Sequence, residues 1–149
     1  MIERMTHRYL VLWELLLVTL AGGCTSSTAE YDRAAYQQAV SLKVESLVLM
    51  DKAVEPYSNH EASVDALLVN LDEKAYEYDK GRPKNEAVTR QWEILKDPNR
   101  RLLGYFLQRW RDEKQLSKAY VVGQKKNASL AYDQIIGLLS GQIKREQVE

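Results

Sequence analysis

The sequence predicts an all-α fold, an up-down-up-down four-helix bundle behind a signal peptide and a short tether. Past residue 28 the apolar residues recur at the three- and four-residue spacing of amphipathic helices, and no stretch alternates as a half-buried strand would. Only three prolines and seven glycines occur among 149 residues, which leaves room for long helices. Four long helices with short connections favour the up-down-up-down arrangement. At this length one domain is expected.

The first helix is expected from about Ala29 to Val54. Pro56 ends it, because the residue before a proline is pushed out of the helical region. Its apolar stripe consists of Ala35, Ala39, Leu42, Leu49 and Ala53, with Tyr36, Val40, Leu47, Met50 and Val54 beside it.

The second helix is expected to open at Ser58, because Ser58 and Glu61 have the spacing of a capping box. Its predicted core face consists of Val64, Leu67, Leu68, Leu71, Ala75 and Tyr78. On that face Tyr78 points inward, so Tyr76 is predicted to be the more exposed of the two tyrosines. Gly81 stops the helix two places before a proline.

The third helix is expected to start near Asn85. Asp97-Pro98 indicates either a kink or an N-cap followed by proline at the first helical position. One helix in two segments bent at Pro98 is favoured, because the apolar pattern continues on both sides of it. That pattern consists of Val88, Trp92, Leu95, Leu102, Leu103, Phe106, Leu107 and Trp110.

The fourth helix is expected to begin at Ser117 and to continue as far as Ile143. Its core face consists of Ala128, Tyr132, Ile135, Leu138, Leu139 and Ile143. Gly137 and Gly141 are four residues apart, a spacing that lets another backbone come close. That neighbour is expected to be a helix of the same chain, or a partner chain in a dimer.

The N-terminus has the pattern of a secretory signal. Residues 1–8 are polar with two arginines, and residues 9–22 are almost wholly apolar. The apolar run of about 14 residues is shorter than the roughly 20 needed to span a bilayer. Glu14 would also place a carboxylate in the hydrocarbon, which is costly. A permanent transmembrane helix is therefore the weaker interpretation.

The segment Leu20-Ala21-Gly22-Gly23-Cys24 resembles the lipobox of bacterial lipoproteins. In that family the cysteine thiol receives a diacylglycerol, and the chain is then cut before the cysteine. The resemblance implies that Cys24, the only cysteine, becomes the lipidated first residue of the mature protein. It covers residues 1–24 alone, and the leucine stands four places before the cysteine where the family usually has three. Cleavage after Gly23 without lipid, or a buried apolar cysteine, are the alternatives.

Four parts of the chain are expected. The resemblance implies a signal peptide at 1–23 and a lipidated cysteine that begins the tether at 24–28, and the residue pattern beyond predicts a helical bundle at 29–145 and a frayed end at 146–149. Acyl chains such as palmitate would hold the protein to a membrane of the cell envelope. Aspartate directly after the cysteine favours the inner membrane in enteric-type lipoproteins. Thr25 stands there, so the resemblance implies the outer membrane, with the domain facing the periplasm.

Composition excludes several classes of function. With 21 basic and 21 acidic residues the net charge is zero, which provides no field to attract nucleic acid. One cysteine allows neither an intramolecular disulfide nor a thiolate zinc cluster. Only His60 would remain after loss of the signal, and it is predicted to be exposed. No phosphate loop or nucleophile–base set occurs. We therefore expect no cofactor, no metal and no enzyme.

The sequence thus predicts a membrane-anchored, non-catalytic lipoprotein whose helical domain binds another envelope protein. The alternative is a periplasmic module for a small apolar ligand. The candidate contacts for such a ligand or partner are Trp92, Phe106, Trp110 and Tyr132. A core role is favoured for Trp110, because it continues the stripe of Phe106. An enzyme that uses carboxylates alone is the third hypothesis, and it requires a pair of buried, facing carboxylates.

Overall fold

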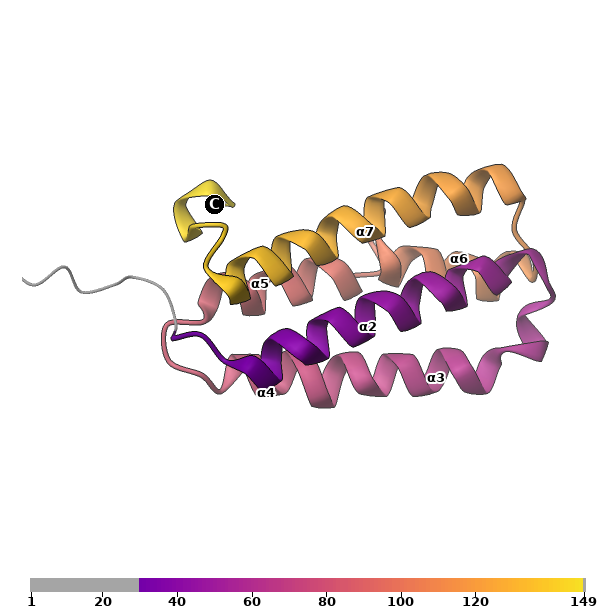
Figure 1. The fold of residues 1–149 in the computed structure, drawn as a ribbon. Helices are drawn as coiled ribbons and strands as arrows, with labels where there is room; N and C mark the ends of the chain where they lie inside the picture. The colour runs from indigo at the N-terminus through magenta and orange to yellow at the C-terminus, as the bar shows by residue number, and fades with distance from the viewer. Residues whose placement is uncertain (1–29, 149) are drawn as a thin grey trace, which may run out of the picture.

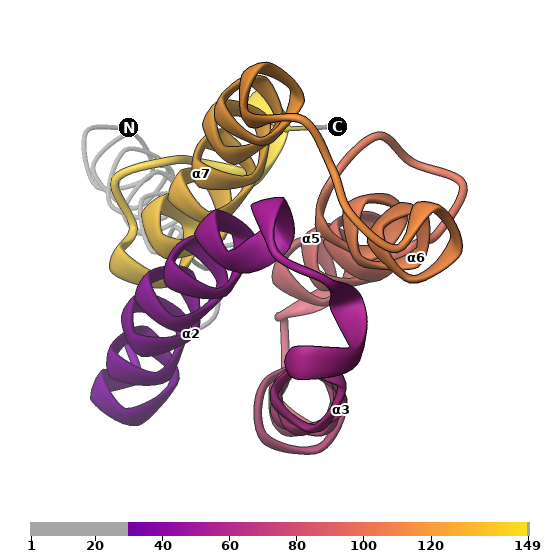
Figure 2. The ribbon, with the colours of Figure 1, turned by 90° about the vertical axis from the view of Figure 1, so that its right-hand side faces the viewer.

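A computed structural model describes residues 30–148 of the chain, and the signal peptide, Cys24 and tether predicted from the sequence lie outside these residues. The described helices run up, down, up and down in four columns, as predicted (Figures 1 and 2). The columns are α2 (Arg33–Asp51), then α3 (Glu61–Val69) with the π-helical segment η3 (Asn70–Tyr76) and α4 (Glu77–Lys80), then α5 (Glu86–Lys96) with α6 (Leu103–Glu113), and finally α7 (Lys118–Ser140). No helix among these residues is long and apolar enough to cross a membrane.

The core lies between the four columns and contains most of the predicted apolar stripes. The first stripe, from Ala35 to Ala53, is buried throughout. The largest fully buried side chains are Trp92, Trp110, Tyr132, Phe106 and Met50. Outside the core, α2 and α7 are joined by two ion pairs, Lys43–Asp133 and Lys125–Asp51, each with a nitrogen–oxygen distance of 2.6 Å.

Helix α2 begins at Arg33, later than predicted, because Asp32 caps it. The Asp32 carboxylate accepts hydrogen bonds from the amides of Ala34 and Ala35 at 2.7 and 3.1 Å, which satisfies two donors of the first turn. At the other end the chain tightens into a 3₁₀ turn, Lys52–Val54, and becomes extended at Glu55, as expected of the residue before a proline.

Arg82, in the loop between α4 and α5, joins the start of the described chain to the core. Its Nη2 donates to the carbonyl oxygen of Glu30 at 2.8 Å, and its Nε lies 3.5 Å from the Asp32 carboxylate. Its Nη1 contacts the buried carboxylate of Asp79 at 3.2 Å. Three points of the fold therefore depend on one guanidinium.

The predicted capping box at Ser58 is wrong. Ser58 lies in a 3₁₀ turn, Tyr57–Asn59, and α3 begins only at Glu61 with no side-chain cap at its N-terminus. Tyr57 explains the difference, because its side chain is buried and its amide donates to the carbonyl oxygen of Lys114 at 2.8 Å. A backbone contact with Lys114, at the C-terminal end of α6, therefore fixes the conformation of this turn.

The predicted order of exposure of Tyr76 and Tyr78 is also wrong. Tyr78 is 43% exposed, while Tyr76 packs against the core. The π-helical segment holds one residue more than an α-turn, which rotates the following side chains by roughly 100°. Asp79, instead of Tyr78, follows Leu71 and Ala75 into the core. The segment still ends where predicted, with Gly81 after α4.

The third column is broken at Pro98 instead of bent. Helix α5 ends at Lys96, and α6 begins only at Leu103, so neither the kink nor a helix capped by Asp97 is formed. The Asp97 carboxylate instead accepts from the amide of Asn99 at 2.8 Å and closes a local turn. The new helix then packs closely on the old one, because Gly104 lies against the carbonyl of Lys96.

Helix α7 starts as predicted, with the Ser117 hydroxyl accepting from the amide of Tyr120 at 3.4 Å.

The predicted end of α7 is wrong, because Gly141 takes the left-handed conformation (φ 73°) directly after Ser140. Ile143 then folds back, and its amide donates to the carbonyl oxygen of Gly137 at 3.0 Å. The Ile143 side chain covers Gly137, so the close neighbour predicted for this glycine is a side chain and not another helix backbone. A 3₁₀ turn, Arg145–Gln147, follows.

Candidate functional site

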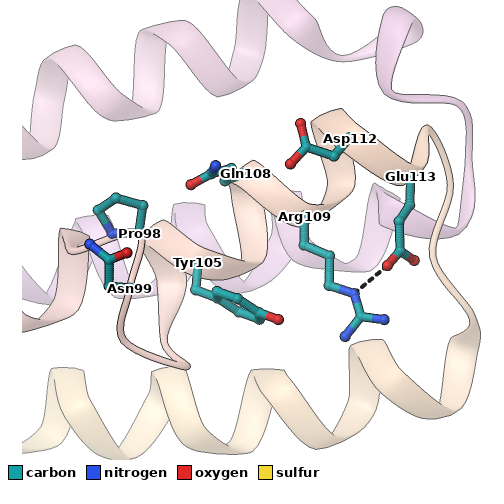
Figure 3. A pocket seen from close by; sticks show the side chains of 7 residues that line it. All are labelled: Pro98, Asn99, Tyr105, Gln108, Arg109, Asp112 and Glu113. Atoms are coloured by element: carbon teal, nitrogen blue, oxygen red, sulfur yellow. Dashed lines mark hydrogen bonds and ion pairs between the residues drawn. The ribbon is translucent and has the colours of Figure 1, made fainter.

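The outer face of α6 carries an open hollow of about 520 Å³, which we call the α6 hollow (Figure 3). The apolar face of α6 is buried, so the opposite side of the helix is left for polar side chains. The break before α6 adds the loop residues Pro98 and Asn99 at one end. The lining residues are Pro98, Asn99, Tyr105, Gln108, Arg109, Asp112 and Glu113.

Arg109 is the central cation of the α6 hollow. Its Nε donates to Glu113 Oε1 at 2.6 Å (Figure 3). Its guanidinium carbon lies 4.3 Å from the centre of the Tyr120 ring on α7. The Glu113 carboxylate, followed by the Tyr120 phenol, holds the pKa of Arg109 above its ordinary value. Arg109 is therefore a permanent cation, held on one side by a carboxylate and on the other by an aromatic face.

Two buried oxygens on α7 have no aligned hydrogen-bond partner in the described part of the chain. They are Tyr120 Oη and Gln124 Oε1, one turn apart on the same face of α7. The Tyr120 ring stacks on Phe106 of α6, with ring centres 6.1 Å apart and planes 3° from parallel. We call the group of Arg109, Glu113, Tyr120 and Gln124 the α6–α7 seam. Buried polar atoms are nearly always hydrogen-bonded in proteins, so these two oxygens are exceptions among the described residues.

A second open hollow, of about 510 Å³, lies between the π-helical segment and α5 and shares Pro98 with the first. Lys96 pairs there with Asp72 and lies 3.6 Å from the centre of the Tyr76 ring. The Tyr76 hydroxyl donates to Glu93 at 3.0 Å. The polar groups of this hollow already have partners, so it is the weaker candidate for binding.

The four aromatic residues predicted as ligand or partner contacts are in the core. Trp92, Phe106, Trp110 and Tyr132 are each at most 1% exposed, and none of them lines the α6 hollow. The structure does bring Trp92 and Tyr132 together, edge to face at 5.9 Å.

The polar tips of these aromatic residues have partners inside the protein. Trp92 donates to Asp79 at 2.7 Å, and Trp110 donates to the carbonyl oxygen of Glu55 at 3.1 Å. The Tyr132 hydroxyl lies 2.7 Å from the Ser46 hydroxyl, and burial raises the pKa of Tyr132.

The carboxylate chemistry of the third hypothesis requires two buried, facing acids. Among the described residues Asp79 is the only buried acid, and its neighbours are the donors Arg82, Asn85 and Trp92. No cluster of three or more potential metal ligands occurs in residues 30–148. A carboxylate surrounded by donors serves to satisfy them, so we assign Asp79 a structural role.

His60 lies in the connection between α2 and α3, at the end of the bundle away from the start of α2 (Figure 1). It was predicted to be exposed, but its side chain is only 17% exposed, and its Nε2 lies 2.7 Å from the Glu55 carboxylate. Its ring lies 5.6 Å from the Trp110 ring. The hydrogen bond from His60 is the main cause that holds the pKa of Glu55 below its ordinary 4.5.

This arrangement predicts a loss of stability in acid. Asp32 also has a lowered pKa, with the Tyr78 hydroxyl as the main cause. A carboxyl group whose pKa is lowered by folding stabilises the protein above its unfolded pKa, and this contribution is lost as the pH falls through the folded value. We therefore expect the midpoint of thermal unfolding to fall as the pH is lowered from 4.5.

The measurement is a series of thermal unfolding curves between neutral pH and acid. Glu55→Gln and Asp32→Asn should each reduce the pH dependence. Glu73→Gln, which removes an exposed carboxylate of the π-helical segment, should leave it unchanged. Equal pH dependence in all four proteins would contradict the assignment.

Comparison of the chain with protein-family models, curated proteins and solved structures finds no match.

Proposed function

We propose that this protein is a non-catalytic lipoprotein of the cell envelope, whose helical bundle binds another protein. The observation that carries the proposal is the segment Leu20-Ala21-Gly22-Gly23-Cys24, which resembles a lipobox and lies just ahead of the bundle. Two or three acyl chains on Cys24 would give stable anchoring, whereas a single chain binds a membrane only marginally. An outer membrane, with the domain facing the periplasm, fits Thr25 after the cysteine.

The position of the α6 hollow supports a binding role for the anchored domain. The chain from Cys24 to Asp32 reaches at most roughly 28 Å when fully extended. The end of the bundle at which α2 starts would thus stay close to the membrane. Helix α6 lies toward the opposite end of the bundle (Figure 1), where a partner could approach its polar face.

The first test is the intact mass of the protein isolated from membranes, wild type beside Cys24→Ala. We expect the wild type to lack residues 1–23 and to carry the added mass of two or three acyl chains. The Cys24→Ala variant should carry no lipid and keep its N-terminus, while Thr25→Ala, a neighbouring change, should be processed normally. A wild type that keeps its N-terminus, or that is cut without lipid, would refute the anchor.

Protein binding is tested in the same membranes with a photo-crosslinking amino acid. Placed at Gln108, which lines the α6 hollow, it should give a discrete adduct of one size. Placed at Val44, an exposed residue of α2, it should give none. Equal patterns from the two positions would count against the α6 hollow as the contact surface.

A further inference from the structure

Exposed apolar side chains are concentrated on two neighbouring helices of the described chain. Of the large ones, four lie on α2 and α7, each 56–61% exposed, and they are Val44, Val48, Val122 and Leu130. We call these four residues the α2–α7 face. Helices α2 and α7 lie side by side, with α3 and α6 on the opposite side of the bundle (Figure 2).

The four residues point to the same side of the helix pair, away from the core. Asp51 of α2 and Asp133 of α7 each pair with a lysine of the other helix, so they mark the line along which the two helices meet. At about 100° per residue, Val44 lies about 20° from Asp51 around α2. Val122 lies about 20° from Asp133 around α7, and the other two apolar residues lie about 60° from these acids. The α2–α7 face is therefore one continuous outer surface.

This surface also carries positive charge. Helices α2 and α7 hold five basic and three acidic residues, whereas the rest of the described chain holds 14 basic and 15 acidic residues. Lys126 is exposed and stands midway between Val122 and Leu130, one turn from each. A lysine stem can lie along apolar neighbours while its ammonium group contacts a polar surface. The combination favours an occupant that is both apolar and anionic.

The tether brings this surface within reach of a membrane. The chain from the proposed lipid on Cys24 to Asp32 spans at most roughly 28 Å. Val44 lies about 17 Å along α2 from its start at Arg33. Because the anchor keeps the bundle beside the lipid, docking is intramolecular, and a weak contact is sufficient to hold the face on the surface. A soluble partner would have to bind without this advantage.

We propose that the α2–α7 face lies on the surface of the membrane that holds the lipid anchor. Its valines and its leucine enter the boundary between headgroups and acyl chains, and Lys126 contacts the phosphates of anionic lipids. Helices α3 and α6 then face away from the membrane, which leaves the α6 hollow open to the partner protein. This inference rests on the lipid anchor of the proposed function and adds to it the orientation of the domain.

The test measures the depth of single fluorophores in the full-length lipidated protein, reconstituted into vesicles of phosphatidylcholine and phosphatidylglycerol. Acylation occupies the thiol of Cys24, the only cysteine, so one introduced cysteine carries the only fluorophore. Lipids with a nitroxide near the headgroup should quench a fluorophore at Val48→Cys or Leu130→Cys about threefold more strongly than one at Val69→Cys. Val69 is the matched control, because it is 49% exposed but lies on α3.

The charge of the face is tested with vesicles of phosphatidylcholine alone and with Lys126→Glu. Each change should reduce the quenching at Val48→Cys by about twofold or more, because it removes the attraction between Lys126 and anionic headgroups. Lys74→Glu changes an exposed lysine of the π-helical segment and should leave the quenching unchanged.

Equal quenching at Val48→Cys and Val69→Cys would overturn the proposal, as would quenching that depends on neither the lipid charge nor Lys126. A bis-maleimide that joins two copies through Leu130→Cys, without quenching at that position, would assign the face to a second copy of the chain instead. The two vesicle compositions are compared with one labelled protein, so that comparison holds even if Lys126→Glu folds poorly. A chain without acyl groups refutes the anchor, whereas an acylated chain with unquenched fluorophores refutes only this inference.

Discussion

Replacing Asp79 by alanine is expected to lower the free energy of unfolding by about 3–5 kcal/mol, the usual cost of removing one partner from a buried charged network. The Asp79 carboxylate is 2% exposed and accepts from Trp92 Nε1 at 2.7 Å and from Asn85 Nδ2 at 3.0 Å. Alanine would leave both donors buried without this acceptor, and Arg82 would lose its anchor in the core.

Urea denaturation of wild type and variant measures this loss. Asp133→Ala is the matched control, because it removes the exposed partner of Lys43 and should cost no more than about 1 kcal/mol. Asp79→Asn keeps the shape and one acceptor oxygen, so it should fall between the two. A loss for Asp79→Ala as small as that for Asp133→Ala would show that the network contributes little.

Adding a single methyl group at Gly104 is expected to destabilise the protein by about 3 kcal/mol, the upper part of the range for overpacking. A Cβ on Gly104 would collide with the carbonyl of Lys96, at the end of α5. A backbone carbonyl at a helix end cannot turn aside as a flexible side chain can. Gly104→Ala therefore forces α5 and α6 apart.

Gly123→Ala is the control, because no atom lies within 4 Å of the added Cβ on this part of α7. Alanine is the better helix former, so this change should stabilise the protein by about 0.5–1 kcal/mol. Thermal unfolding of both variants thus gives shifts of opposite sign. Shifts of the same sign would contradict the close approach of α6 to α5.

The fold could be predicted from the sequence because it depends mainly on the spacing of apolar residues. The buried stripe of α2 and the start of α7 at Ser117 follow from that spacing and from local capping chemistry. The π-helical segment could not be predicted in this way. Its extra residue brings Asp79 to Trp92, thirteen positions further along the chain, and no local pattern reports that contact.

The candidate site was less accessible to sequence reasoning. The sequence predicts aromatic residues such as Trp92 as contacts because ligand pockets are mostly apolar, but the same rings fill cores. Gln108 and Asp112 look like ordinary surface residues until the break at Pro98 places a loop beside them. The two buried oxygens of the seam, on Tyr120 and Gln124, can be recognised only once the packing of α6 against α7 is known. Cys24 stays a prediction from the resemblance alone.

The contacts of Arg82 have a mechanical consequence. A pull on the chain ahead of Glu30, as drag on a bound partner would produce in an anchored protein, is resisted first where Arg82 holds the Glu30 carbonyl and the Asp32 carboxylate. The guanidinium passes this load to Asp79 in the second column. The force is therefore carried by the first and second columns together. As a result, α2 is protected from unfolding one turn at a time from its N-terminus.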